Sequence, residues 1–168
     1  SETSKTYPLA YLAQVIDTIA QKTEAILLFN YMPSQKEDAK KLFSLCLPST
    51  KDQIAFEIFA PSLRKFLGIL HHCDALIGNE GGTTNMAKAL GKPTFAIFAP
   101  WIDKKGWHTF ANDANIAIHV ADYFKDEFRR LDKKELKKRT EALYLKLKPA
   151  LFEEKLISFL ENKILSDQ

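Results

Sequence analysis

Apolar residues recur along this chain with two periods, one typical of helices and one typical of buried strands. Continuous apolar runs predict strands over Ala25–Phe29, Ile54–Phe59, Ala75–Gly78, Thr94–Phe98 and Asn115–Val120. Segments with helical spacing lie between and after these runs, and they begin near Pro8, Ser34, Ser62, Thr83, Asp132 and Phe152. Alternating helices and strands are typical of an α/β domain. We therefore predict an α/β fold with a parallel sheet.

Residues with strong positional preferences set the expected helix ends. Ser34, with Glu37 three positions later, forms a capping box, and Ser62 caps the following helix. The helix from Thr83 to Leu90 is expected to stop at Gly91.

Composition adds little to the predicted fold but excludes several classes of protein. The 168 residues are 46% hydrophobic and 27% charged, which suits one globular domain with a sizeable core. A formal net charge of +3 is too small to indicate nucleic acid as a partner. The chain has two cysteines, Cys46 and Cys73, and lacks an apolar stretch long enough to span a membrane. We expect a cytoplasmic protein without a disulfide framework.

Two adjacent glycines, Gly81 and Gly82, stand between the strand at Ala75–Gly78 and the helix that follows. A helix N-terminus at the carboxyl edge of a parallel sheet presents unpaired N–H groups and partial positive charge, and glycine lets a phosphate approach them. The sequence thus indicates an anion site on the N–H groups of Gly82, Thr83, Thr84 and Asn85. The Thr83 and Thr84 hydroxyls add donors. A tight turn capped by Thr83 explains the same spacing equally well.

The segment Cys73–Phe98 resembles the signature of the heptosyltransferases of glycosyltransferase family nine. Residues that stand where that pattern puts them are Asp74, Gly78, Asn79, Gly82, Ala87, Ala89, Leu90, Gly91, Lys92 and Pro93. The resemblance continues more faintly from Lys5 to about Trp107.

This resemblance implies a Rossmann-like parallel sheet with helices on both faces, as the C-terminal half of a B-type glycosyltransferase fold. Residues 1–168 would form one donor-nucleotide-binding domain, with an α/β core over about 1–122 and C-terminal helices over about 123–168. The N-terminal acceptor domain, which holds the family's catalytic aspartate, is not in this sequence, so the chain alone is expected to be inactive. The family has one more strand just before the first helix, and without it the sheet would have an unpaired gap.

The implied reaction is transfer of heptose from ADP-heptose to a lipopolysaccharide core-type acceptor, with inversion. The ADP-sugar is a substrate, and neither a cofactor nor a metal ion is expected. Its diphosphate would lie on the turn from Gly82 to Asn85. A family lysine that faces the diphosphate corresponds to Lys5. The implied partners are the ADP-linked sugar, an anionic lipid-linked saccharide acceptor and the N-terminal domain of the same protein.

Three positions depart from the family pattern. Glu80 stands where the family has an aspartate, and its carboxylate can still accept from a ribose or sugar hydroxyl. Asn85 replaces a histidine, and an amide carries no proton near neutral pH. Gln35 replaces a glutamate that holds the ribose hydroxyls. The residues expected to bind the donor are Lys5, Gln35, Glu80, Gly81, Gly82, Thr83, Thr84 and Asn85.

Other chemistry has less support in the sequence. His71 and His72 point to different sides of a helix, and together with Cys73 and His108 they lack the spacing of a closed zinc site. The glycines do not flank a serine nucleophile. The loop Pro100–Trp107 follows a strand at the same sheet edge as the glycine turn, so it is expected either to wall the nucleotide or to be a plain surface loop. A non-catalytic nucleotide- or anion-binding module and an interaction domain are the alternative functions.

The predicted helix Asp132–Lys148 carries more basic than acidic residues and an apolar stripe of Leu136, Leu143 and Leu147. The stripe is expected to pack on the domain, with the charges on a solvated face. A basic surface also attracts anionic membranes. We therefore expect peripheral contact with the inner membrane, where the implied acceptor is found.

Overall fold

Three parallel strands form the sheet in the computed structural model, which describes residues 6–104, 113–128 and 131–165. The strands β1 (Leu76–Asn79), β2 (Thr94–Ile97) and β3 (Asn115–Ile118) are hydrogen-bonded in the order β1-β2-β3. Every residue of β2 is buried, as a central strand with both faces covered requires. The parallel α/β fold predicted from the sequence is confirmed.

Helices precede, connect and follow these strands. Those in the described residues are α1 (Leu9–Lys22), α2 (Lys36–Leu45), α3 (Pro48–Lys51), α4 (Leu63–His71), α5 (Gly82–Ala89), α7 (Lys125–Phe128), α8 (Lys133–Lys138), α9 (Thr140–Lys146) and α10 (Glu153–Leu160). Short 3-10 turns cover Pro33–Gln35, Val120–Asp122 and Pro149–Leu151, and a π turn covers Glu161–Leu165.

Two of the expected helix ends are confirmed in atomic detail. The Ser62 hydroxyl oxygen accepts from the N–H of Lys65 at 3.4 Å, so Ser62 caps α4. Gly91 follows α5 with a φ of +71°, the left-handed conformation that glycine adopts without strain. The helix expected from Ser34 begins instead with the 3-10 turn, and the Gln35 side-chain oxygen accepts from the N–H of Met32 at 2.9 Å.

The strands expected at Ala25–Phe29 and Ile54–Phe59 are not formed. A single parallel bridge between Leu27 and Ile54 replaces them. Among the described residues, this bridge and the three-stranded sheet are separate pairings, and β1 pairs only with β2. Apolar runs report burial, but a strand also needs a neighbouring backbone to pair with. The gap expected in the sheet is therefore present in the described part of the chain.

The single helix expected over Asp132–Lys148 is divided into α8 and α9. Arg139, which separates them, has a ψ of 10°. No glycine or proline marks this break, so the sequence pattern gave no sign of it. The predicted apolar stripe does pack on the core: Leu143 and Leu147 are buried and Leu136 is half-buried against them. The short helix α7 was not predicted.

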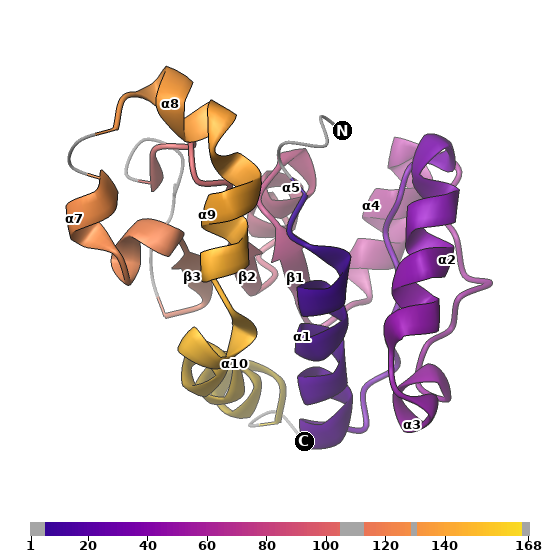
Figure 1. Cartoon of the computed structure of the whole chain (residues 1–168). Coiled ribbons are helices and arrows are strands. Elements are labelled where there is room, and N and C mark those ends of the chain that lie inside the picture. The colour runs from indigo at the N-terminus through magenta and orange to yellow at the C-terminus, as the bar shows by residue number, and fades with distance from the viewer. Residues whose placement is uncertain (1–5, 105–112, 129–130, 166–168) are drawn as a thin grey trace.

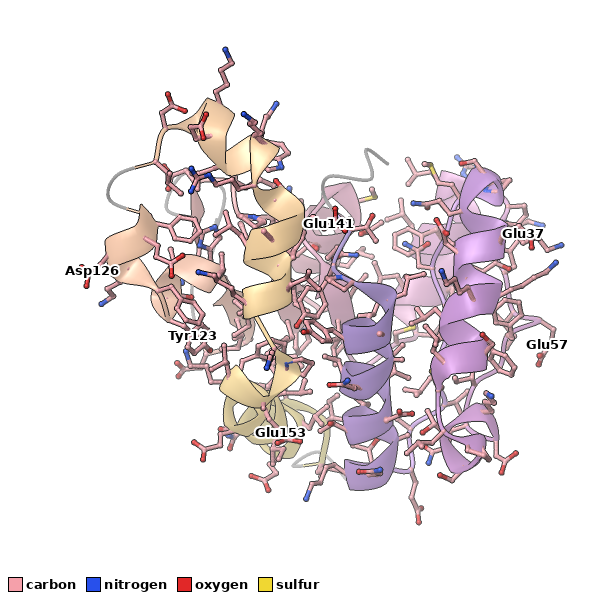
Figure 2. All side chains as sticks on the ribbon, viewed as in Figure 1. Glu37, Glu57, Tyr123, Asp126, Glu141 and Glu153 are labelled. Carbon is pink, nitrogen blue, oxygen red and sulfur yellow. The ribbon has the colours of Figure 1, made fainter. Side chains whose placement is uncertain are left out.

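Helices cover both faces of the sheet. Ile77 of β1 packs in the cluster that includes residues of α1, α9 and α10, whereas the adjacent Leu76 packs with Phe66 of α4 and Ala87 of α5. Neighbouring strand residues face opposite sides, so the two clusters lie on opposite faces. Figure 1 shows α1 in front of the sheet between α10 and α2, both of which it contacts. In Figure 2, Glu37 and Asp126 point away from the core.

Tyr7 fixes the start of α1 against the sheet and the C-terminal helices. Its backbone N–H donates to Asn79 Oδ1 at 2.9 Å, at the end of β1. Its hydroxyl donates to the carbonyl of Leu147, and its ring meets the Tyr144 ring with centroids 5.5 Å apart. Burial raises the pKa of Tyr7 far above its ordinary value, so the hydroxyl keeps the proton that it donates.

Candidate functional site

The carboxyl ends of the three strands meet at one edge of the sheet because the strands are parallel and in register. Asn79 aligns with Ile97, and Ile97 aligns with Ile118. The segments that continue from these positions line one pocket of about 640 Å³, together with Phe128 of α7 and Lys133 of α8. Pockets of a few hundred Å³ accommodate small-molecule ligands. The fold thus gathers three loops around one candidate site.

The glycine turn connects β1 to α5 at this edge. The N–H groups of Thr84 and Asn85 donate to the carbonyl of Gly81, at 3.1 and 3.4 Å. The expectation that these two groups lack intrahelical partners is therefore wrong. In the described part of the chain, no carbonyl accepts from the N–H groups of Gly82 and Thr83. Two donors and the positive end of the α5 dipole are thus available to an anion.

The residues predicted around the turn do not all face the pocket. Glu80, Gly81, Gly82 and Asn85 line it. Thr83 is half-exposed and is not among the lining residues. Thr84 is 1% exposed, and its hydroxyl donates to the carbonyl of Asn79 at 3.4 Å. This hydroxyl therefore joins α5 to β1 inside the protein.

The loop after β2 forms a second wall of the pocket. Residues 100–104, the described part of the loop Pro100–Trp107, line the same pocket. The ammonium groups of Lys137 and Lys133 lie 4.6 and 5.8 Å from the Trp101 ring centroid, in cation–π geometry. The Lys104 ammonium contacts both carboxylate oxygens of Asp122, at 2.7 and 2.8 Å. This ion pair ties the loop after β2 to the 3-10 turn after β3.

His119 is a pocket residue that the sequence reasoning missed. It follows β3 directly and is 6% exposed. Its Nδ1 accepts from the N–H of Ala121 at 3.0 Å, so the neutral ring carries its proton on Nε2. Nε2 is buried, and among the described residues no acceptor meets it in standard hydrogen-bond geometry, although the backbone of Pro100 and Ala99 lies beside the ring. A polar residue at the carboxyl end of a predicted strand was the available signal, since such residues meet at the edge where ligands bind.

Two predicted donor-binding residues lie away from this pocket or outside the described residues. Gln35 is half-buried near the start of α2 and does not line the pocket. Lys5 lies outside the described residues, as do Lys105, Trp107 and His108. In the described part of the chain, no group of three His, Cys, Asp or Glu side chains is arranged to hold a metal ion.

The comparisons with known proteins agree with this arrangement. The model of glycosyltransferase family 9 (heptosyltransferase) matches residues 1–138, most of the chain. The chain belongs to this family. The solved structure of the E. coli ADP-heptose LPS heptosyltransferase II is similar in fold, with a TM-score of 0.56 and 14% sequence identity over 84% of this chain and 43% of that one. The chain thus spans less than half of that structure. No curated protein matches the sequence.

The family and the fold predicted from the sequence are therefore confirmed, and the chain has the α/β fold of one half of a B-type glycosyltransferase. Among the described residues, no helix has the length and apolar character needed to cross a lipid bilayer.

Proposed function

We propose that this chain is the donor-binding half of an enzyme that transfers heptose from ADP-heptose to a lipopolysaccharide core-type acceptor, with inversion. The observation that carries the proposal is the glycine turn, where Gly82 opens α5 on the pocket surface at the carboxyl edge of the sheet. Family membership supports glycosyl transfer. The likeness to an ADP-heptose enzyme favours this donor among nucleotide sugars.

In this proposal the chain stabilises the leaving group. An acceptor oxygen attacks the anomeric carbon from the face opposite the diphosphate, through an oxocarbenium-like state. The bond between that carbon and the diphosphate oxygen breaks, and negative charge grows on the diphosphate. The N–H groups of Gly82 and Thr83 are fixed by the fold before the reaction, so they stabilise this charge without reorganising.

Lys5 is proposed to add a full positive charge beside the diphosphate. Tyr7 is tied to Asn79, which immediately precedes Glu80 and the glycines. Covalent geometry keeps the α-carbons of residues two positions apart within about 7 Å. The anchor at Tyr7 therefore supports a role for Lys5 near the turn.

The remaining parts of the enzyme are proposed to lie elsewhere. The base that deprotonates the acceptor hydroxyl is the family's aspartate in an N-terminal domain, and the acceptor is an anionic lipid-linked saccharide. The reaction would take place in the cytoplasm, at the surface of the inner membrane. Residues 1–168 would act as one domain, which binds the donor but does not catalyse alone.

A transfer assay tests this proposal. A protein that joins this chain to its N-terminal domain is incubated with a lipopolysaccharide core acceptor and with ADP-heptose, UDP-glucose or GDP-mannose. We expect ADP release and acceptor glycosylation with ADP-heptose alone, and none with the 168-residue chain by itself. Transfer from UDP- or GDP-sugars in preference to ADP-heptose would contradict the assigned donor, and absence of transfer from any sugar would contradict the assigned activity.

A further inference from the structure

The helix α8 brings positive charge to one wall of the pocket. Lys133 lines the pocket, and Lys137 follows four positions later, on the same face of the helix. The ammonium groups of Lys133 and Lys137 lie 5.8 and 4.6 Å from the centroid of the Trp101 ring. Trp101 itself lines the pocket. Helical spacing therefore directs two lysines to one pocket residue.

The acidic residues of α8 do not neutralise these two lysines. The Asp132 carboxylate caps the helix by accepting from the N–H of Glu135 at 2.8 Å. The Glu135 carboxylate lies 3.5 Å from Nε of Arg139. Among the described residues, neither Lys133 nor Lys137 forms an ion pair. The α8 wall is thus positively charged.

The acidic residues of the pocket lining take part in other interactions. The Asp122 carboxylate pairs with Lys104 at 2.7 Å. Burial lowers the pKa of Lys88 of α5, and the Glu80 carboxylate opposes that effect, so Glu80 acts on α5. Asp103 is exposed and also has an interaction of its own. The uncompensated charge beside the pocket is therefore that of α8.

The contact with Trp101 leaves the hydrogen-bonding capacity of the two lysines unused. A ring face attracts a cation but offers no lone pair, whereas each ammonium group carries three N–H donors. Two like charges beside one ring also repel each other. An anion that binds both ammonium groups gains charge-assisted hydrogen bonds and relieves this repulsion. The arrangement around Trp101 therefore favours an anionic ligand.

We propose that Lys133 and Lys137 form an anion subsite for the acceptor, in which their ammonium groups bind a carboxylate or phosphate carried by the acceptor saccharide. The inference rests on the proposed function, because it supposes that an anionic acceptor meets the donor in this pocket. The glycine turn and α8 line the same pocket of about 640 Å³, so an acceptor held at α8 lies beside a donor held at the turn. This half of the enzyme would then contribute to acceptor specificity as well as to donor binding.

The same helix supplies a matched control. The test variant carries Lys133→Gln and Lys137→Gln, which remove two charges four positions apart. The control variant carries Lys134→Gln and Lys138→Gln, which remove two charges at the same spacing but outside the pocket lining and the contacts with Trp101. All four lysines are exposed, so both variants should fold, and thermal melting checks this.

The measurement is the KM for the acceptor in transfer from ADP-heptose, with the protein that joins this chain to its N-terminal domain. The acceptor is the core saccharide freed from its lipid. We expect the test variant to raise this KM at least about tenfold, the range of a charge-assisted hydrogen bond. The kcat and the KM for ADP-heptose should stay within about threefold of the wild type, as should every parameter of the control variant.

Two modified acceptors identify the group that the lysines bind. One has its carboxyl groups reduced, and the other has its phosphates removed. Removing the group that is bound should raise the wild-type KM and abolish most of the difference between the wild type and the test variant. Equal losses in the test variant for all three acceptors would mean that the lysines only hold Trp101 in place, and would overturn the subsite.

The other outcomes separate this inference from the proposed function. An unchanged acceptor KM in the test variant, or an equal rise in the control variant, would overturn the subsite while leaving the transfer activity intact. A loss seen only with lipid-linked acceptor in anionic vesicles would assign the lysines to lipid headgroups and overturn it as well. Absence of transfer by the wild-type protein would overturn the proposed function, on which the subsite depends.

Discussion

Burial decides the protonation state of His119. Desolvation lowers the pKa of this imidazole. The Asp122 carboxylate and the backbone of Pro100 and Ala99 oppose that effect, while the Lys104 ammonium adds to it. The Phe128 ring packs edge-to-face with the imidazole, with ring centroids 5.5 Å apart, and carries no charge. The neutral ring with its proton on Nε2 is therefore the form that the fold selects.

A pH dependence of stability follows from this shift. Because the pKa of His119 is lower in the folded than in the unfolded state, the unfolded chain binds the proton more readily, and the contribution of His119 to stability is lost as pH falls below about 6.5. We expect the free energy of unfolding to fall more steeply from pH 7.5 to 5.5, roughly the range around a histidine pKa, in the wild type than in His119→Asn. Urea denaturation at several pH values measures this. Parallel pH profiles for the two proteins would show that His119 is not the group responsible.

Binding measurements test the proposed role of Lys5 directly, because its proposed partner is the negative charge of the diphosphate. Lys5→Ala should weaken ADP about tenfold and AMP less than about threefold, since a charge-assisted hydrogen bond contributes about 1.5 to 3 kcal/mol. Calorimetry with both nucleotides compares the losses. Lys36→Ala, an exposed lysine at the start of α2, is the control. Equal losses for ADP and AMP in Lys5→Ala would remove Lys5 from the diphosphate.

At the scale of secondary-structure elements, α1 is joined to the end of α9 by two tyrosine hydroxyls in different environments. The buried Tyr7 hydroxyl donates to the carbonyl of Leu147, and the exposed Tyr11 hydroxyl donates to the carbonyl of Leu145 at 3.1 Å. The pair offers a matched comparison of one hydrogen bond inside and one outside the core.

Tyr7→Phe should lower the free energy of unfolding by about 1 to 3 kcal/mol, because it leaves a buried carbonyl without a donor. Tyr11→Phe should cost less than about 0.5 kcal/mol, because water replaces its hydroxyl. Urea denaturation of both variants measures the difference. Similar losses in the two variants would mean that the Tyr7 hydrogen bond does not anchor α1.

The sequence predicted elements well where local signals agree with the tertiary environment. The strands β1, β2 and β3, the Ser62 cap and the Gly91 stop were all found in this way. The strands predicted around Leu27 and Ile54 do not form, because an apolar run indicates burial but not whether a partner strand lies beside it.

The candidate site was predicted in part. The glycine turn follows from local sequence, since a strand, two glycines and a helix are contiguous in the chain. The other walls depend on tertiary structure, since His119 and Gly82 line the same pocket because the parallel strands β1, β2 and β3 end at one edge of the sheet. The wrong assignment of free N–H groups to Thr84 and Asn85 arose because the first turn of α5 closes onto Gly81.

At the scale of the whole molecule, the basic residues of α8 form a surface that would attract an anionic membrane. Lys134 and Lys138 of α8 are exposed, while the apolar stripe of α8 and α9 packs against the core. Any membrane attraction of these helices is therefore mainly electrostatic, because their apolar stripe is covered and Leu145 of α9 is the one large apolar side chain of α8 and α9 that is exposed.

Binding to anionic vesicles should be weak and salt-sensitive, with no binding to neutral vesicles. Replacing Lys134 and Lys138 with glutamine should reduce it by about 30-fold at low salt, at about 1 kcal/mol for each basic residue near the bilayer. Replacing Lys36 and Lys41 of α2, also exposed, should have little effect. Cosedimentation with phosphatidylglycerol and phosphatidylcholine vesicles measures both. If the α8 and α2 variants bound equally, the basic helix would not be the membrane contact.

The proposed function depends on the glycine turn as an anion site. Calorimetry of ADP binding to the wild-type chain, Gly82→Val and Gly68→Val tests it most directly. An added Cβ at Gly82 meets only Met86 at 3.7 Å, and one at Gly68 of α4 meets nothing within 4 Å, so both variants should fold. We expect micromolar to millimolar ADP affinity, roughly the range of modest nucleotide sites, to persist in Gly68→Val and to fall at least about a hundredfold in Gly82→Val, where the side chain occupies the phosphate's approach to the backbone. Unchanged ADP affinity in a folded Gly82→Val would contradict the account.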